Sequence, residues 1–85
     1  MKETHLYEKP EFVGAIRILP YQFTISTLLQ PSGRVAFSVT GEAADISHAL
    51  KDIAENRPIG IRDLIESINR TRSEMFRAKQ AGALR

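Results

Sequence analysis

The sequence predicts a small α+β domain: a three-stranded antiparallel meander followed by two helices, in the order β-β-β-α-α. Three observations support this class. Apolar residues recur at every second position up to about residue 40, as in half-buried strands. They then recur with a 3.6-residue spacing, as in amphipathic helices. Finally, 85 residues fit one domain, and its core must be thin.

The first ten residues are expected to form a flexible arm that ends at Pro10, with a single domain following over residues 11–78. Residues 11–18 are predicted to be the first strand, because alternation would place four small or apolar residues on one face. These residues are Phe12, Gly14, Ile16 and Ile18. Pro20 lies in the corner that follows, since proline cannot donate to a strand ladder.

Residues 22–29 and 34–40 are predicted to form a hairpin. In the second strand, Val35, Phe37 and Val39 alternate with small or polar residues and should face the core. The intervening Gln-Pro-Ser-Gly is typical of a tight turn, because proline presets the backbone and glycine tolerates positive φ at the exit. Strand 22–29 would occupy one edge of strand 34–40 and leave the other edge free for a partner chain.

Two helices are predicted in the second half. The first covers residues 42–56, with Thr40 as its N-cap and Pro58 beyond its end. The second runs from 61 to about 78, which is longer than a small sheet can cover, so its last turns should project or meet another subunit. Residues 79–85 would form a flexible basic tail. The two apolar stripes are Ile46-Ala49-Leu50-Ile53 and Ile61-Leu64-Ile65-Ile68.

The composition excludes several classes of protein. With 42% hydrophobic and 26% charged residues, the chain is not of the disordered type. It has no cysteine, which excludes disulfides, thiolate metal ligands and cysteine nucleophiles. It shows neither a signal-peptide pattern nor an apolar run long enough to span a membrane, so we expect a cytoplasmic protein without membrane contact. Residues 60–85 hold six basic and three acidic residues, so an anionic partner would meet this end.

Residues that could carry chemistry are sparse. Asp45, His48 and Asp52 share one helical face and could in principle hold a metal ion. The simpler interpretation is a solvated face on which His48 pairs with Asp52 one turn away. The sequence shows no nucleophile beside a base and no glycine-rich phosphate loop. We therefore expect no enzyme activity, no cofactor and no metal.

Aromatic and basic residues are candidates for contacts with nucleic acid. Four strand aromatics could stack bases on an exposed sheet, but we expect them in the core. They are Phe12, Tyr21, Phe23 and Phe37. In the second helix, Arg62, Glu66, Arg70 and Glu74 repeat every four residues, which favours a ladder of ion pairs over a basic face. The less compensated cations are Arg72, Arg77, Lys79 and Arg85.

Residues 34–77 resemble a ribbon-helix-helix DNA-binding domain. A strand leads directly into a helix, and Arg57-Pro58-Ile59-Gly60 joins it to a second helix that begins Ile61-Arg62-Asp63-Leu64. The resemblance covers about half the chain and lies in element order, lengths and apolar spacing; two predicted strands precede it, which departs from the family. It implies that strand 34–40 pairs with a second copy, that the ribbon enters the major groove, and that the second helix's N-terminus holds phosphate.

The first predicted function is therefore a small dimeric nucleic-acid-binding or regulatory protein. Four candidate contacts follow from position in that family: Arg34, Ser38, Thr40 and Arg62. Arg72 joins them because of its charge. The expected partners are a second copy of the chain and DNA.

The alternative function is a non-enzymatic interaction or assembly module, either a homodimer or an accessory subunit of a larger protein. Its predicted contact is Arg72, Met75 and Phe76, because the two apolar residues lie beyond the core stripe of the second helix. A thin core would also gain from association.

Overall fold

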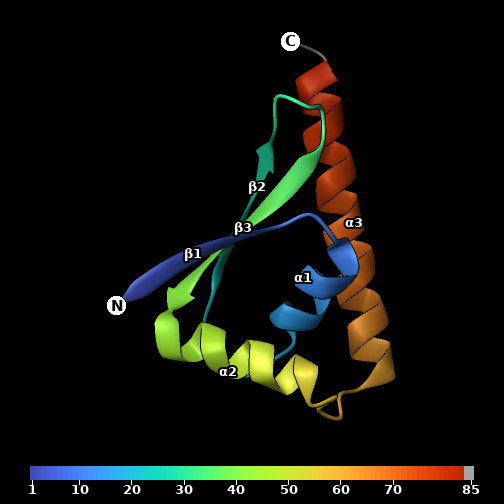
Figure 1. The fold of residues 1–85 in the computed structure, drawn as a ribbon. Helices are drawn as coiled ribbons and strands as arrows, with labels where there is room; N and C mark the ends of the chain where they lie inside the picture. The colour runs from blue at the N-terminus through green and yellow to red at the C-terminus, as the bar shows by residue number, and fades with distance from the viewer. Residues whose placement is uncertain (84–85) are drawn as a thin grey trace.

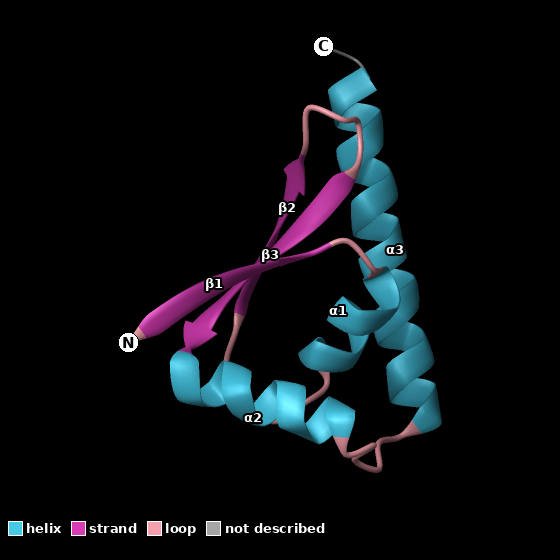
Figure 2. Ribbon diagram, viewed as in Figure 1, coloured by secondary structure: helices cyan, strands magenta, loops and turns pink. Residues whose placement is uncertain are grey.

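The structure, a computed structural model, describes residues 1–83. The elements in chain order are β1 (Lys2–Tyr7), α1 (Pro10–Arg17), β2 (Thr24–Leu29), β3 (Val35–Glu42), α2 (Ala43–Ala54) and α3 (Ile61–Ala83). The three strands form one sheet, α1 and α3 lie on one side of it, and α2 lies across its end (Figures 1 and 2). The α+β class is confirmed, but the order is β-α-β-β-α-α.

The sheet is antiparallel with strand order β1-β3-β2, so it is not the predicted meander. β3 is central: Thr40 lies opposite Thr4 on one side and opposite Thr24 on the other. The expectation that one edge of strand 34–40 would be free is therefore wrong. The first ten residues, expected to be an arm outside the domain, supply the strand that fills this edge.

Residues 10–17 form helix α1, where the sequence predicted a strand. Pro10 stands in the first turn, where an N–H has no helical partner to lose, and Glu11 and Arg17 suit the two ends of the helix dipole. Gly14 lets α1 approach α3 closely, since a Cβ there would lie 2.8 Å from Ile68 Cγ1. Packing on α3 thus overrides the strand pattern of this segment.

The hairpin predicted over residues 22–40 is confirmed by the pairing of β2 with β3. At its turn, the Gln30 N–H donates to the Arg34 carbonyl at 2.8 Å and the Gly33 N–H donates to the Gln30 carbonyl at 2.9 Å. Gly33 has a φ of 86°, which a side chain would strain.

The core lies between the sheet and the helices. Val35, Phe37 and Val39 are buried on β3, as predicted. The other buried hydrophobic residues on this side are Val13, Ile16, Leu19, Ile46 and Ala49, whereas Ala36 is buried on the opposite side of β3. The predicted stripe of α3 is only partly used, because Ile61 and Ile65 are 77% and 53% exposed.

The buried face of α3 instead carries small side chains, which the close α1–α3 crossing requires. Thr71 is completely buried, and its hydroxyl donates to the Ser67 carbonyl at 2.8 Å. The Ser67 hydroxyl in turn donates to the Gly14 carbonyl at 2.8 Å. These hydrogen bonds satisfy the polar groups that the crossing buries.

The helix ends differ from the predicted ones. Glu42, and not Thr40, precedes the first turn of α2, and its side chain makes no cap hydrogen bond. α3 continues through residues 79–83, which were expected to belong to a tail; residues 84–85 of that tail lie outside the described residues. α3 does not project from the sheet, since Gly82 lies against the Leu29 side chain.

Candidate functional site

The side of the sheet opposite the helices is uncovered, and we call it the outer face. The strand register defines it as the residues that alternate with the buried Val35, Phe37 and Val39 and their cross-strand neighbours. It comprises Thr4 and Leu6 of β1, Ala36, Ser38 and Thr40 of β3, and Thr24, Ser26 and Leu28 of β2. All of these residues are uncharged. Charges appear only at the ends of the face, with Lys2 and Glu42 at one end and Arg34 at the other.

The outer face carries hydroxyl groups and two exposed leucines. Leu6 is 54% exposed and Leu28 is 47% exposed, while Ala36 is completely buried on the central strand. The hydroxyls of Thr4 and Thr40 are hydrogen-bonded across the strands at 2.8 Å. An uncharged surface of this kind can pack against another protein surface without burying an unpaired charge.

The two edges of the sheet differ in charge. β1 carries Lys2, Glu3 and His5, and charged side chains are a common protection of an edge strand. β2, Thr-Ile-Ser-Thr-Leu-Leu, has no charged residue, proline or glycine. Its edge therefore lacks the usual features that prevent pairing with another chain.

The register identifies which backbone groups of β2 face outward. Hydrogen-bonded and non-hydrogen-bonded pairs alternate along antiparallel strands. Gln30 and Arg34 form a hydrogen-bonded pair, since the Gln30 N–H donates to the Arg34 carbonyl. The odd-numbered residues of β2 therefore belong to the non-hydrogen-bonded pairs. The N–H and C=O groups of Ile25 and Thr27 therefore point away from β3. No turn or side-chain hydrogen bond within residues 1–83 reaches these groups.

A cleft of about 550 Å³ runs along this edge, between β2 and α3. Ile25, Ser26 and Thr27 all line it. The side chains of Ile25 and Thr27 point toward the helical layer, and Ser26 lies between them in the strand. The opposite wall is formed by Arg17, Arg70, Glu74, Arg77 and Ala78. We call these eight residues the β2 cleft.

The β2 cleft is basic. The Arg17 guanidinium donates to both Glu74 carboxylate oxygens, at 2.9 and 2.5 Å, and holds the Glu74 pKa below its ordinary value. The Arg70 Nε lies 3.4 Å from the same carboxylate, but Arg70 is 76% exposed. Arg77 makes no ion pair with any residue of the described chain. Three guanidinium groups thus face one carboxylate.

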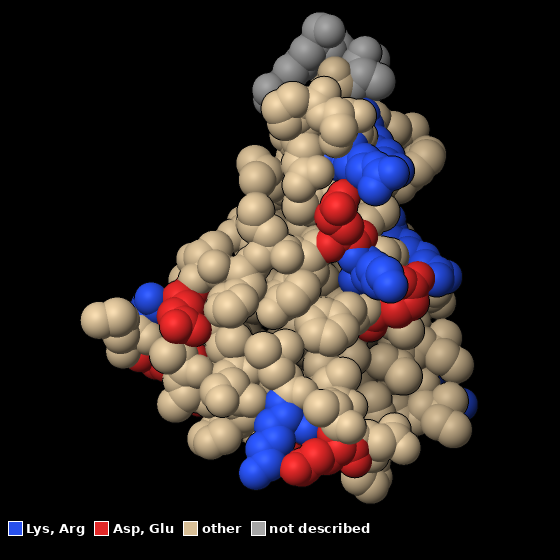
Figure 3. Space-filling view, in the orientation of Figure 1, with Lys and Arg blue, Asp and Glu red and all other residues tan. Residues whose placement is uncertain are grey.

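Acidic residues limit how far this basic character extends. The neighbouring hollow shares Arg17 and Arg70 with the β2 cleft and adds Asp63 and Glu66. On the face shown in Figure 3, basic and acidic side chains alternate along α3, and the surface between β1, α1 and α2 is uncharged. The hollow next to the β2 cleft therefore carries charges of both signs.

The residues predicted to bind nucleic acid lie on two sides of the sheet. Ser38 and Thr40 are half-buried on the outer face, and Arg34 follows the hairpin turn. Arg62 and Arg72 stand on α3, on the helical side. Arg72 is engaged with Glu11 of α1 at 2.5 Å. Arg34 lies beside the C-terminal part of α3, and Arg62 lies at the N-terminal end of this helix. The two arginines are therefore about 30 Å apart along the helix axis.

The residues predicted to form an oligomer contact share one side of α3. Phe76 is 62% exposed, Met75 is half-buried, and Arg72 is 57% exposed at its side chain. Ile61 and Ile65 precede them at spacings that place all of these residues on neighbouring helical faces. This stripe is apolar but narrow, and Arg72 interrupts it.

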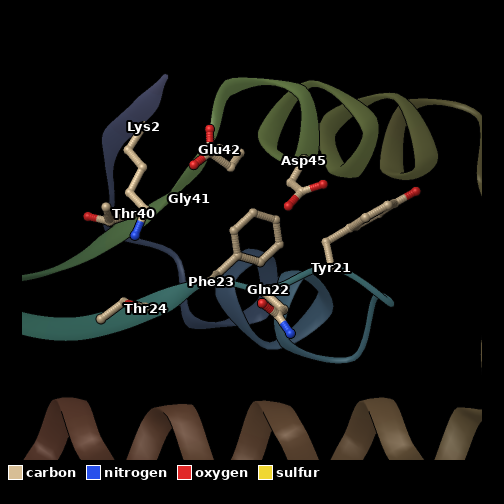
Figure 4. A pocket seen from close by; sticks show the side chains of 9 residues that line it. All are labelled: Lys2, Tyr21, Gln22, Phe23, Thr24, Thr40, Gly41, Glu42 and Asp45. Carbon is tan, nitrogen blue, oxygen red and sulfur yellow. The ribbon is translucent and has the colours of Figure 1, made fainter.

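A polar hollow of about 540 Å³ lies where β3 meets α2 (Figure 4). The Phe23 ring occupies its centre, because Gly41 has no side chain: a Cβ there would lie 2.6 Å from Phe23 Cδ1. Lys2, Glu42 and Asp45 stand around the ring. The N-terminal ammonium donates to Glu42 at 2.9 Å and holds its pKa below the ordinary value. Charges of both signs favour no single kind of ligand here.

The His48–Asp52 pair expected on α2 does not form. Asp52 instead accepts hydrogen bonds from the Tyr21 hydroxyl and from Arg57, each at 2.7 Å, and these lower its pKa. His48 lies beside the Tyr21 ring, with centroids 5.9 Å apart. No group of three potential ligands among residues 1–83 could hold a metal ion.

The strand aromatics are not arranged to stack bases. Phe37 is completely buried, Phe12 packs on Tyr7 with ring centroids 4.8 Å apart, and Phe23 lies beside Tyr21. The outer face contains no aromatic residue. No helix in the described part of the chain is both long and apolar enough to cross a membrane.

The sequence interpretation missed the β2 cleft. It singled out Arg77 as one of the less compensated cations, but it gave no role to Arg17, which stands in an apolar segment. A lone arginine in an apolar segment needs a charged partner or a route to water. That signal predicts a partner for Arg17, although it does not identify Glu74, which lies 57 residues away.

Comparisons with protein-family models, curated proteins and solved structures return no match to this chain. What the protein does must therefore be inferred from its own surfaces.

Proposed function

We propose that this protein is a non-enzymatic interaction module that docks through the uncovered side of its sheet. The observation that carries the proposal is the outer face, an uncharged surface with Leu6 and Leu28 exposed at its two flanks. Antiparallel sheets commonly expose one polar face to water, but this face also exposes two leucines and carries no charge between its ends.

The amount of exposed surface supports the same proposal. The chain exposes 5956 Å² of solvent-accessible surface. A monomer of 9.5 kDa is expected to expose about 5,000 Å². The excess of about 900 Å² is close to the ~800 Å² that each partner buries in a standard interface.

The shape explains this excess. The extents of 40 × 32 × 17 Å describe a thin plate, and the radius of gyration of 13.3 Å exceeds the ~12 Å expected for 85 residues. Such a plate has two layers, and its outer face would lie in the core of a three-layer assembly.

The nucleic-acid hypothesis has less support from the geometry. Its candidate residues are divided between the two sides of the sheet, and Arg72 is already paired with Glu11. Base stacking would need aromatics that the outer face lacks. DNA binding remains the outcome that would replace our proposal.

The test introduces one charge into the outer face. Leu28→Glu places a carboxylate at a 47% exposed position on an edge strand, which the fold should tolerate. Ser32→Glu makes the same change of charge in the exposed turn and serves as the control. Sedimentation velocity of the purified chain measures self-association, and site-specific cross-linking from outer-face positions in source-cell extract measures partner binding.

We expect the wild type and Ser32→Glu to form the same assembly and Leu28→Glu to lose it. A protein that stays monomeric at high micromolar concentration, and gives no cross-link that depends on Leu28, would show that the outer face is not an interface.

A further inference from the structure

We infer that the edge of β2 binds an extended, acidic segment of a partner protein by strand addition, with the β2 cleft receiving its carboxylates. This inference rests on the proposed function, because it identifies one partner of the interaction module. Two independent features of the molecule meet at this edge: unpaired backbone groups and a basic cleft.

The backbone of β2 can form a ladder with an added strand. The N–H and C=O groups of Ile25 and Thr27 face outward, as the register shows. These groups are two residues apart, which is the repeat of hydrogen bonding along an antiparallel ladder. An extended peptide would satisfy them with main-chain hydrogen bonds, which supply affinity without requiring a particular sequence.

The β2 cleft supplies the preference for acidic side chains. An added strand directs alternate residues toward the helical layer, at intervals of about 7 Å. There they meet Arg70 and Arg77, which line the cleft and are both exposed. Arg17 is 14% exposed and already bonded to Glu74, so its role is to hold the wall of the cleft. Glutamate or aspartate at alternate positions would form charge-assisted hydrogen bonds with the two exposed arginines.

Charge argues against a second copy as the occupant. Two copies paired through β2 would bring two basic clefts together at the two-fold axis. β2 itself has no acidic residue to offer the partner's arginines. Like charges brought together at an interface oppose association. An acidic segment from a different chain neutralises the cleft instead.

Backbone geometry argues for a peptide over a nucleic acid. A phosphate backbone could use Arg70 and Arg77, but it has no main-chain N–H to offer the carbonyls of Ile25 and Thr27. β1 is a poorer strand acceptor, because its own charges of both signs border its edge.

The test uses the full chain and short labelled peptides in which glutamate alternates with valine and threonine. Fluorescence anisotropy measures the affinity. One control peptide replaces each glutamate with lysine, and a second carries N-methyl groups on alternate amides, which blocks the ladder without changing the charge. Duplex and single-stranded DNA are titrated in parallel.

We expect only the unmodified acidic peptide to bind, and more weakly as salt rises. Arg70→Ala and Arg77→Ala should each weaken this binding up to about fivefold, the loss expected for one ion pair at an exposed position. Arg62→Ala removes the same charge from α3 away from the cleft and should leave affinity unchanged. Thr27→Pro removes an edge-facing N–H but no bond to β3, and should weaken binding to a similar extent. Circular dichroism verifies the fold of each variant.

Four outcomes would overturn the inference. Equal binding of the N-methylated peptide would exclude strand addition, even if Thr27→Pro failed to fold. Equal weakening by Arg62→Ala would show that the β2 cleft is not the site. DNA binding without peptide binding would replace the peptide with nucleic acid. If no peptide binds but Leu28→Glu still abolishes assembly, this inference fails while the proposed function stands.

Discussion

Gly14→Ala is the substitution that most directly tests how α1 and α3 pack. Gly14 is buried where the two helices cross, and the Ser67 hydroxyl donates to its carbonyl at 2.8 Å. A Cβ at this position would lie 2.8 Å from Ile68 Cγ1 and 3.0 Å from Ile68 Cα and N. Two of these three atoms belong to the backbone, so the new methyl group can be accommodated only if the helices separate.

Two opposing contributions determine the effect on stability. Replacing glycine by alanine inside a helix stabilises it by up to about 1 kcal/mol. Overpacking a close contact usually costs about 1–3 kcal/mol, and the backbone contacts place this case toward the upper end. We therefore expect a net loss of about 1–2 kcal/mol in the free energy of unfolding. For 85 residues this corresponds to a fall in Tm of roughly 5–15 °C.

Urea denaturation followed by circular dichroism measures this loss as a lower midpoint at unchanged slope. Gly82→Ala is the matched control, because it is the same change in a helix. Its new methyl group would meet the end of the Leu29 side chain, which is 41% exposed and can rotate away. We expect it to change stability by less than about 0.5 kcal/mol. A Gly14→Ala protein as stable as the wild type would refute the close crossing.

Three further predictions concern individual side chains. Glu74→Gln should destabilise the protein by about 1–2 kcal/mol at neutral pH. Arg17 lowers the pKa of Glu74 in the folded state, so this stabilisation is present above the ordinary Glu pKa of 4.5 and is lost as the pH falls through the pKa of the folded protein. The urea denaturation curves of the two proteins should therefore converge in acid. Tyr21→Phe should raise the Asp52 pKa toward its ordinary value of 3.8, measured by NMR titration, because it removes the hydrogen bond that lowers it most. Phe37→Ala should cost about 3–5 kcal/mol and leave little folded protein by circular dichroism.

The local features of the hairpin and of the two later helices could be predicted from sequence. Proline and Gly33 identify the turn because each has a specific backbone requirement there. The change of apolar period near residue 40 identifies α2. The side of α3 that would be buried could not be predicted, because Thr71 is completely buried there while Ile61 and Ile65 are exposed. Hydrophobicity ranks Ile61 and Ile65 above Thr71, but helix–helix distance favours the smaller side chain.

The secondary structure of the first twenty residues could not be predicted correctly, for a similar reason. Residues 10–17 contain an alternating pattern that fits a strand and an i, i+3 pattern, Val13 and Ile16, that fits a helix. Contact with α3 decides between them. The polar β1 lacks a hydrophobic pattern, and it forms a strand because it pairs with the edge of β3. Long-range partners of this kind also define the β2 cleft, since Arg17 and Glu74 are far apart in sequence.

The position of β1 also constrains the ribbon-helix-helix interpretation. In that family the ribbon strand pairs with a second copy through a free edge, whereas here six residue pairs join β3 to β1. Releasing β1 would forfeit about 1–6 kcal/mol of cross-strand interactions. Pairing two copies through β3 would regain a similar amount but would also lose translational and rotational freedom. A DNA-bound ribbon therefore requires that β1 detach from β3 and that DNA binding supply the free energy lost in pairing the two copies. The His5 amide faces β3 in this register. Its hydrogen exchange would accelerate if β1 detaches on DNA binding and would stay slow if the sheet remains intact.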